Sequence, residues 1–261
     1  MSDKATTGAR VPDHKTVFLL RLADTAMVLS QRLSEWCGKG PALEEDMALT
    51  NVALDLIGQA RFWYGYAGAL EDRGRDEDAL AFTRDAHDFR NLLLVEQPNG
   101  TYADTLARQF YFDAWHFLLL QQLAGSTDAR IAGIAEKSVK EVGYHVRRSA
   151  DLIVRLGDGT ERSHAMIQAA LDDLWMYTGE MFAADAVDAA MAAQGVAPAL
   201  ESLRQPWLDH LARIFAQATL KLPPVAAWMQ QGGKQGVHTE HLGYLLAEMQ
   251  FLQRAYPGAS W

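Results

Sequence analysis

The sequence predicts an all-α protein, a bundle of four long helices followed by further helices toward the C-terminus. Apolar residues recur every three or four positions, as in amphipathic helices, and no segment alternates with period two for long enough to form a strand. The helical segments are long and their loops short, which is typical of a bundle, and no repeat of the solenoid type is present. The clearest apolar stripe contains Leu22, Ala26, Leu29, Leu33 and Trp36.

The first two predicted helices form a pair joined by a short loop. The first begins near Asp13, a residue type that caps helix N-termini, and ends at the helix-breaking run CGKGP. The second begins with the acidic run Glu44 to Asp46, because carboxylates interact favourably with the helix dipole there, and continues to the polar break EDRGRDED. A shorter helical segment, DALAFTRDAHDFRNLLLVE, follows and ends at the turn QPNG.

A second pair of long helices comes next, and shorter helices complete the chain. The segment TYADTLARQFYFDAWHFLLLQQLAG forms the third helix. The fourth begins at Ser126 or Asp128 and ends at Gly157. Three further helices are expected. One follows the run GDGT and continues to about Gln194, the next covers about 199–220, and the last follows a glycine-rich loop and ends at Tyr256.

The composition is that of an acidic globular protein. Aspartate and glutamate total 33 against 24 lysines and arginines, which argues against a surface for nucleic acid or anionic membrane. The start has no apolar signal segment, and no apolar run is long enough to span a membrane. The single cysteine, Cys37, fits a reducing compartment and is expected to be a small buried hydrophobe. We therefore expect a cytoplasmic protein of one domain, residues 1–261, in which residues 1–12 form a disordered leader.

Each of the four long helices carries a carboxylate among its apolar residues, and burying an unpaired carboxylate is costly. Two pairs of carboxylates, each about thirty residues apart and joined by a longer crossover, match the layout of ferritin-like di-iron bundles. In that layout the second and fourth helices each supply Glu-x-x-His, because iron centres of this type need carboxylate and imidazole ligands together. The four residues here are Asp24, Asp55, Asp113 and Glu141.

The ligand set of such a site is incomplete in this sequence. On the second helix Gly58 stands where a histidine belongs, and on the fourth helix Tyr144 takes that place, with His145 one residue later in the run KEVGYHVRRS. A spacing of four still places Glu141 and His145 about 40° apart around a helix, so Gly58 is the decisive departure. We predict a metal-free polar cluster, the remnant of a di-iron site. Its members are Asp24, Asp55, Gly58, Asp113, Glu141, Tyr144 and His145, with Arg61, Arg108 or Arg147 as candidate donors.

Two other groups of polar residues are weaker candidates for a metal site. Asp113 and His116 are three residues apart, but the third helix of such bundles supplies a carboxylate alone, so we interpret His116 as a surface or interface residue. The run HTEH, His238 to His241, resembles a metal cluster, yet Thr239 is expected to cap a helix there. The glycine-rich run around Lys234 lacks the pattern of a P-loop.

Six stretches of the sequence resemble the family of structural C subunits of the bacterial 1,2-phenylacetyl-CoA epoxidases, multicomponent monooxygenases of phenylacetate breakdown. The resemblance extends from about Phe18 to Trp261, and its longest element is GVHTEHLGYLLAEMQFLQRAYPG. The others are VLSQRLSEWCG, ALDLIGQAR, NLLLVEQPNG, ARQFYFDAWH and KEVGYHVRRS.

This resemblance implies a non-catalytic, ferritin-like subunit that pairs with a homologous catalytic A subunit, which holds the di-iron centre and binds phenylacetyl-CoA. A small B subunit and a reductase with FAD, an iron–sulfur centre and NADPH complete the implied complex, and this chain itself is expected to hold no metal or cofactor. The alternative is an autonomous ferritin-like di-iron oxidase with an atypical ligand set, Asp113, Glu141, Tyr144 and His145. A third possibility is that the tail near Lys234 helps hold the phosphates of the acyl-CoA.

Aromatic residues on the second and third helices are too many for one narrow apolar stripe. Each group spans more than one helix face, so we predict that these helices present a second apolar face to the catalytic subunit. The alternative is a thicker core beneath the later helices. The residues are Trp63, Tyr64, Tyr66, Tyr111, Phe112 and Trp115.

Overall fold

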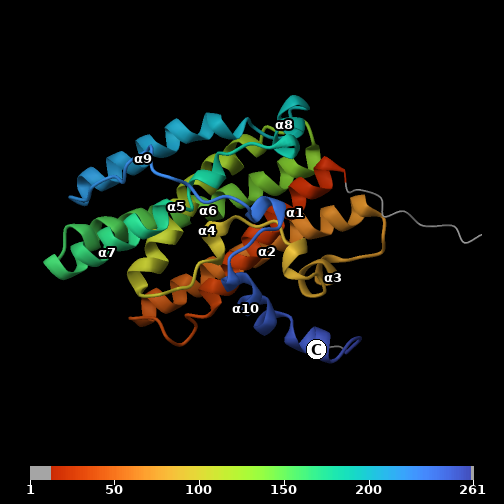
Figure 1. Cartoon of the computed structure of the whole chain (residues 1–261), viewed down its shortest axis with the longest axis horizontal. Coiled ribbons are helices and arrows are strands. Elements are labelled where there is room, and N and C mark those ends of the chain that lie inside the picture. Colours follow the sequence, from red (N-terminus) through yellow and green to blue (C-terminus); the bar gives the residue numbers. More distant parts are fainter. Residues whose placement is uncertain (1–12, 260–261) are drawn as a thin grey trace, which may run out of the picture.

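The four long predicted helices are present and form two helical hairpins. In the computed structural model, which describes residues 13–259, α1 (His14–Ser34) packs along α2 (Leu43–Glu71), and α5 (Tyr102–Leu123) packs along α6 (Ala129–Gly157). α2 also packs against α6, which joins the hairpins into one bundle (Figure 1). The described residues form α- and 3₁₀-helices and no strand. The predicted all-α, ferritin-like layout is confirmed.

The ends of these helices follow the residues that the sequence indicates. The Asp13 carboxylate accepts the backbone N–H of Thr16 at 2.8 Å, and Asp128 accepts two backbone N–H groups in the first turn of α6. α6 ends at Gly157, where an added Cβ would lie 2.4 Å from the carbonyl oxygen of Ala218. Only glycine permits so close an approach of the two backbones, so the residue both ends α6 and seats the later chain against it.

The crossover between the hairpins is a set of short helices rather than the single segment that the sequence predicts. It contains α3 (Glu77–Phe82), the 3₁₀-helix η1 (Ala86–Asp88) and α4 (Leu93–Glu96). Extended residues separate η1 from α4, and two of their backbone N–H groups bond to a carboxylate and a hydroxyl of α1. The prediction was wrong here because apolar periodicity carries no information about such side-chain acceptors.

The chain after α6 is also more broken than predicted. α7 (Glu161–Trp175) stops well before Gln194, and α8 (Ala186–Ala193) begins at a new cap, Asp185, whose carboxylate accepts two backbone N–H groups. The remaining elements are η2 (Gly179–Met181), η3 (Leu200–Leu203), α9 (Arg204–Gln217), η4 (Gly233–Gln235), α10 (Glu240–Met249) and α11 (Phe251–Ala255).

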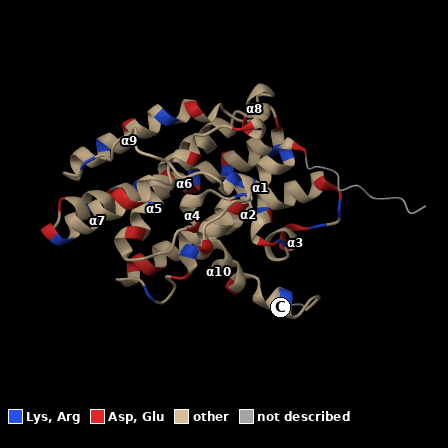
Figure 2. Ribbon diagram, in the orientation of Figure 1, with Lys and Arg blue, Asp and Glu red and all other residues tan. Residues whose placement is uncertain are grey.

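The later helices cover the bundle. α7 and α9 pack on the α5–α6 hairpin, whereas α8 and α10 pack against α1 (Figure 1). Both acidic and basic residues lie along α7 and α9, as expected for helices with one face in water (Figure 2). Within residues 13–259, no helix combines the length and the hydropathy that a bilayer crossing needs.

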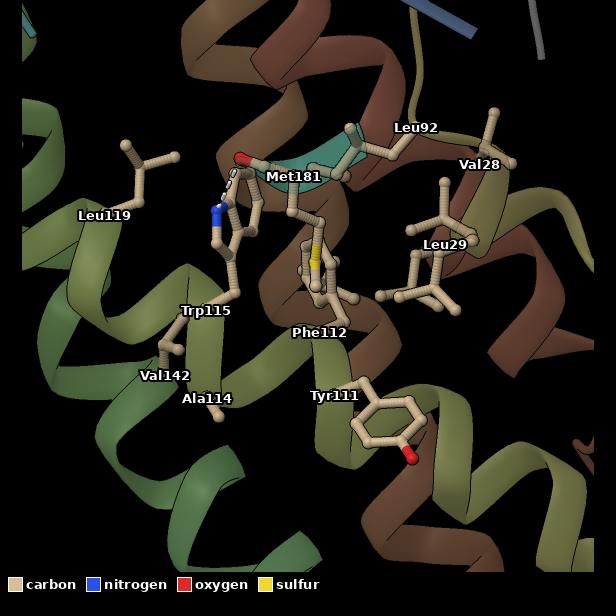
Figure 3. Packing of buried hydrophobic residues seen from close by; sticks show 14 of the residues in the cluster. Val28, Leu29, Leu92, Tyr111, Phe112, Ala114, Trp115, Leu119, Val142 and Met181 are labelled. Atoms are coloured by element: carbon tan, nitrogen blue, oxygen red, sulfur yellow. Dashed lines mark hydrogen bonds between the residues drawn. The ribbon is translucent and has the colours of Figure 1, made fainter. Parts of the chain in front are cut away.

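Five of the six aromatic residues predicted to meet a partner lie in the core of this chain, so that prediction was wrong. Segments after α6 contact the aromatic residues of α5: Trp115 donates its indole N–H to the carbonyl of Met181 at 3.2 Å (Figure 3), and Trp207 donates to the carbonyl of Tyr111 at 3.0 Å. Tyr64 of α2 instead contacts Asp24 of α1 and Arg84 of the crossover. The thicker core, the alternative, is the observed arrangement. The buried residues are Trp63, Tyr64, Tyr111, Phe112 and Trp115.

The sixth aromatic residue, Tyr66, is half-buried and donates its hydroxyl to Asp128 at 2.7 Å, which ties α2 to the start of α6. Cys37 is exposed rather than buried, because it lies in the turns that follow α1. The predicted leader, residues 1–12, lies outside the described residues.

Candidate functional site

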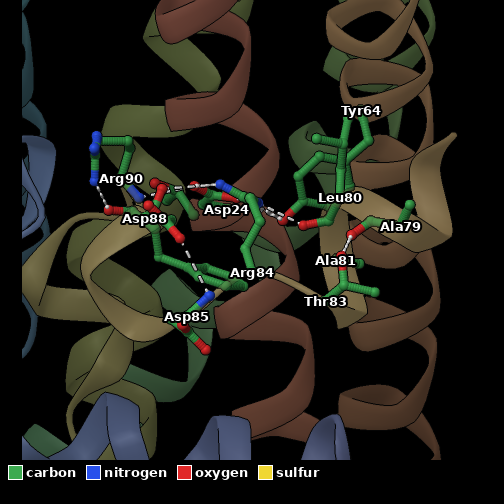
Figure 4. A network of polar contacts seen from close by, with 12 residues as sticks. Asp24, Tyr64, Ala79, Leu80, Ala81, Thr83, Arg84, Asp85, Asp88 and Arg90 are labelled. Atoms are coloured by element: carbon green, nitrogen blue, oxygen red, sulfur yellow. Dashed lines mark hydrogen bonds and ion pairs between the residues drawn. The ribbon is translucent and has the colours of Figure 1, made fainter. Parts of the chain in front are cut away.

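Asp24 is the centre of a closed group of polar contacts in the bundle core, which we call the Asp24 network (Asp24, Tyr64, Arg84 and the backbone N–H of Arg90; Figure 4). The Asp24 carboxylate accepts the Tyr64 hydroxyl at 2.6 Å and the Arg90 N–H at 2.7 Å. Arg84 donates to both carboxylate oxygens, from Nη1 at 3.1 Å and from Nη2. Asp24, Tyr64 and Arg84 are all buried. Donors from α2 and from the crossover therefore occupy both oxygens.

The charges in the Asp24 network balance each other. Burial opposes the charged form of Arg84, but Asp24 and Tyr64 outweigh burial and raise the Arg84 pKa above its ordinary value. Burial and the adjacent Asp24 raise the pKa of Tyr64 well above its ordinary value, so the phenol stays protonated and donates. Arg84 also donates from Nε to the Leu80 carbonyl and lies 4.3 Å from the centre of the Phe89 ring. The carboxylate is thus fully satisfied by protein donors.

A second group of polar side chains lies between α2, α5 and α6, and we call it the Asp113 layer. Gln109 Nε2 donates to Asp113 Oδ1 at 2.5 Å, and Gln59 Nε2 donates to Glu141 Oε2 at 3.2 Å. Each of these carboxylates therefore accepts a hydrogen bond from a neutral amide, whereas Asp24 accepts hydrogen bonds from a cation. The members of the layer are Asp55, Gln59, Gln109, Asp113, His116, Glu141 and His145.

His145 connects the Asp113 layer to the protein surface. Its Nε2 lies 2.9 Å from Oδ2 of Asp55, and the His145 side chain is fully buried whereas that of Asp55 is 37% exposed. Tyr144 contacts the His145 ring edge-on and is itself 48% exposed. A Cβ added to Gly58 would meet no atom within 4 Å. Neither residue that replaces an expected histidine, Gly58 or Tyr144, therefore supplies a donor to the layer.

Hydrogen bonding in the Asp113 layer is incomplete. Burial raises the pKa of Asp113 to about 6 and lowers the pKa of His116 to about 3, so His116 is neutral at physiological pH. Five buried atoms of the layer have no hydrogen-bond partner among residues 13–259, which is unusual for a protein core. These atoms are Gln59 Oε1, Gln109 Oε1, Asp113 Oδ2, His116 Nδ1 and His145 Nδ1.

His116 is buried, contrary to its prediction as a surface or interface residue. Its ring lies 4.8 Å from that of Phe112 and stacks beside Trp115. It also lines a cavity of about 40 Å³ between α1, α5 and the later chain. A cavity of that size holds a few water molecules at most and is too small for an acyl-CoA.

The structure divides the predicted polar cluster into two parts. Asp24 bonds within the Asp24 network, whereas Asp55, Asp113, Glu141 and His145 belong to the Asp113 layer. The two parts differ in their donors, because a guanidinium serves the first and amides and imidazoles serve the second.

The cation that pairs with Asp24 is Arg84 of the crossover and not one of the three arginines predicted as donors from the sequence. Arg61 pairs with Glu77 at the surface, Arg108 donates to the carbonyl of Gln97, and Arg147 is exposed. Arg84 was missed because it lies in an irregular segment with no helical period. The one available signal was that a buried carboxylate on α1 requires a cation or several donors.

A di-iron centre does not fit this donor set. The oxygens of Asp24 are occupied by protein donors, Gly58 has no side chain, and Tyr144 is half exposed. In the described part of the chain, one group of three His, Asp or Glu side chains is close enough to share a metal ion, and it lies at the surface, outside both polar groups. Its members are Asp85, His87 and Asp88.

The run HTEH and Lys234 hold the C-terminal segment on the bundle. The buried Glu96 carboxylate lies 2.9 Å from His238 Nδ1 and accepts the backbone N–H of Thr239 at 2.6 Å, at the N-terminus of α10. The Lys234 ammonium is 2.6 Å from the Asp188 carboxylate, and the residue is 6% exposed. Lys234 is therefore committed to a buried ion pair and not placed to meet acyl-CoA phosphates.

Comparison with known proteins extends over the whole chain. The profile of the family described as "Phenylacetic acid catabolic protein" matches residues 1–261. The chain is 50% identical over 246 residues to the C subunit of 1,2-phenylacetyl-CoA epoxidase from Escherichia coli (strain K12). The aligned region covers 94% of this chain and 98% of that relative.

Proposed function

The chain belongs to the phenylacetic acid catabolic protein family, and from this membership we propose that it is a non-catalytic structural subunit of a di-iron monooxygenase that epoxidises phenylacetyl-CoA in aerobic phenylacetate catabolism. In this role it pairs with a homologous catalytic A subunit, which holds the di-iron centre and the substrate. The similarity to the C subunit of the Escherichia coli enzyme supports the proposal for the entire chain, because almost all of both sequences align.

The Asp24 network is the observation that carries the non-catalytic role. In a di-iron bundle the carboxylate of the first helix must direct an oxygen at a metal. Here a guanidinium, a phenol and a backbone N–H occupy both oxygens of Asp24. Removing such a buried carboxylate from its cation to bind iron would leave Arg84 buried and unpaired, which is strongly unfavourable.

The same network suits a structural role. It joins α1, α2 and the crossover through bonds that form in one register only. Buried charged groups of this kind contribute specificity in some proteins, and we infer that this network fixes the crossover against the α1–α2 hairpin. A rigid bundle of that sort would support a homologous bundle packed beside it.

The rest of the proposed system follows from the resemblance. A small B subunit and a reductase with FAD, an iron–sulfur centre and NADPH would serve the catalytic subunit in the cytoplasm. Electrons and dioxygen would then reach the catalytic subunit, and this chain would contribute assembly and stability.

Co-expression with the catalytic subunit tests the proposal. We expect a stable hetero-oligomer by size-exclusion chromatography with light scattering. Iron measured by mass spectrometry should follow the catalytic subunit and be at background in this chain purified alone. The catalytic subunit expressed alone should be less soluble or lose iron more readily than in the complex.

The competing function is an autonomous di-iron oxidase with Asp113, Glu141, Tyr144 and His145 as ligands. Near-stoichiometric iron in the separately purified chain, together with oxygen consumption without any partner, would establish that function and overturn the structural role. Failure of the two subunits to associate would equally overturn the proposal.

A further inference from the structure

The outward side of α2 exposes several large apolar residues, together with the polar residues Glu44, Asn51 and Arg61. Leu43, Met47, Leu54 and Phe62 are between 40% and 72% exposed. Their helical spacing places them on one side of α2, with Gly58 among them. The opposite side packs in the core, so α2 carries large apolar residues on both sides, which favours a helix that is covered on both.

α6, the neighbour of α2, is built differently. Its buried side is apolar and its outward side is charged, as in a helix that meets water. The two helices are equally long and lie side by side, so the apolar surface of α2 is a property of that helix and not of the bundle. The exposed charged residues of α6 are Arg130, Glu136, Lys137, Lys140, Arg147, Asp151 and Arg155.

Gly58 lies in the middle of this surface, and no close contact within the described chain requires a glycine there. A Cβ at Gly58 would meet no atom within 4 Å, whereas one at Gly68 would lie 2.3 Å from the Arg75 carbonyl oxygen. A glycine within a helix is less stable than alanine there by about 1 kcal/mol. Gly65, two turns after Gly58, has similar space around it, because an added Cβ there would come no closer than 3.9 Å to any atom. The missing side chain of Gly58 leaves the backbone open to an approach from outside.

We propose that a helix of the catalytic subunit packs on the α2 face (Leu43, Met47, Leu54, Gly58 and Phe62), with its closest approach at Gly58. This inference rests on the proposed function, which supplies the partner. Helices pack closely where a small residue allows their backbones to approach, and larger apolar residues on either side then bury their side chains in the contact.

The surroundings of the α2 face indicate the chemistry of that helix. The Lys137 ammonium lies 4.5 Å from the centre of the Phe62 ring, Lys140 is exposed on the next turn of α6, and Tyr144 is 48% exposed. Two lysines of α6 therefore flank the Phe62 end of this surface, whereas Asp55, whose side chain is 37% exposed, lies beside Gly58, in a chain whose net charge is −9. The complementary surface is an apolar helix face with carboxylates opposite Lys137 and Lys140. A second copy of this chain would bring the same lysines and another nine negative charges, which disfavours self-association.

The test substitutes Gly58→Leu and compares it with Gly243→Leu, a helical glycine of α10 that is exposed and has no atom near its Cβ position. We expect Gly58→Leu to weaken the affinity for the purified catalytic subunit by about tenfold or more, about 1.4 kcal/mol, whereas Gly243→Leu keeps wild-type affinity. The thermal unfolding temperature of the isolated Gly58→Leu chain should be at least as high as that of the wild-type chain. Leucine favours the helical conformation more than glycine does, and its side chain meets no clash there.

The possible outcomes test the docking proposal for the α2 face and the proposed function separately. A wild-type chain that does not bind the catalytic subunit overturns the proposed function. A wild-type chain that binds, with Gly58→Leu binding equally well, overturns the α2 face alone. Loss of affinity in both glycine variants, or concentration-dependent dimers of wild type that Gly58→Leu abolishes, also overturns it. If Gly58→Leu does not fold, Leu54→Glu decides, because Leu54 is 59% exposed and its replacement disturbs little of the core.

Discussion

The Asp24 network and the Asp113 layer bury carboxylates of the same bundle in opposite ways. In the network, a guanidinium, a phenol and a backbone N–H occupy both oxygens of Asp24. In the layer, Asp113 has one amide donor and one oxygen without a partner, and burial raises its pKa to about 6. The network pairs its carboxylate with a buried cation, whereas in the layer desolvation disfavours the charged form of Asp113.

This difference has consequences for what each group contributes. A paired buried ion holds its partners in one geometry and depends on each of them. A buried carboxylate that lacks a hydrogen-bond donor can take up a proton instead. Its contribution to the free energy of unfolding then changes with pH. We therefore expect the Asp24 network to be sensitive to substitution and the Asp113 layer to be sensitive to pH.

Arg84→Met is the largest expected effect, because it leaves the Asp24 carboxylate buried without its cation. Breaking a buried pair in this way destabilises proteins by about 3–5 kcal/mol, and we expect the free energy of unfolding in urea to fall by that amount. The matched control is Arg61→Met, which removes a pair between exposed side chains of Arg61 and Glu77 and should change stability by at most about 1 kcal/mol.

The double variant Asp24→Leu with Arg84→Met sharpens the same test. Replacing both charges with apolar groups removes the unpaired ion, so most of the lost stability should return. If Arg84→Met were as mild as Arg61→Met, the Asp24 network would not be the rigid element that the comparison makes it.

The sequence predicted most of the fold because the long helices carry their own signals. Asp13 caps α1 as predicted, Asp128 is the one of the two predicted residues that caps α6, and Gly157 ends α6. The crossover and the chain after α7 were predicted poorly, since their breaks depend on long-range contacts. The N–H of Leu93, for example, bonds to Glu180, which lies 87 residues further along the chain.

The sequence identified the carboxylates of the two polar groups but neither their guanidinium and amide donors nor their grouping. Asp24, Asp55, Asp113 and Glu141 were found because carboxylates among apolar residues stand out in a helical pattern. Their division into two groups depends on Arg84, whose position in space no periodicity reveals. The aromatic surface was wrong for a related reason, because the sequence does not show that later segments such as α9 cover α5.

Asp113→Asn has the next largest expected effect, and it should stabilise the protein above neutral pH. The folded pKa of about 6 lies above that of an unfolded aspartate, near 4, so the native chain binds this proton more tightly. The resulting contribution is fully present below about pH 4 and is lost as the pH rises through 6. Near neutral pH and above, Asn should therefore raise the free energy of unfolding by up to about 3 kcal/mol.

The measurement is urea unfolding of wild type and Asp113→Asn at about pH 4.5, 6 and 7.5. The gap between them should grow with pH, whereas Asp24→Asn should be destabilising at every pH because Arg84 remains buried. A gap that is constant with pH would mean that Asp113 does not titrate in the folded chain in this range.

His116→Leu is the smallest expected effect at neutral pH and has the opposite pH dependence to Asp113→Asn. His116 is neutral in the core, and its Nδ1 has no partner among the described residues. Replacing a buried polar group without a partner by an apolar one should raise the free energy of unfolding by about 1 kcal/mol at about pH 7.5. The folded pKa of about 3 lies below the unfolded value near 6.5, so the unfolded chain takes up this proton as the pH falls. That uptake is absent in the variant, so its advantage over wild type should widen from about pH 6.5 to pH 5 in urea unfolding, while the advantage of Asp113→Asn narrows over the same range. An advantage for His116→Leu that stays constant or narrows toward pH 5 would show that His116 is protonated within the fold, and the Asp113 layer would then contain a cation as the Asp24 network does.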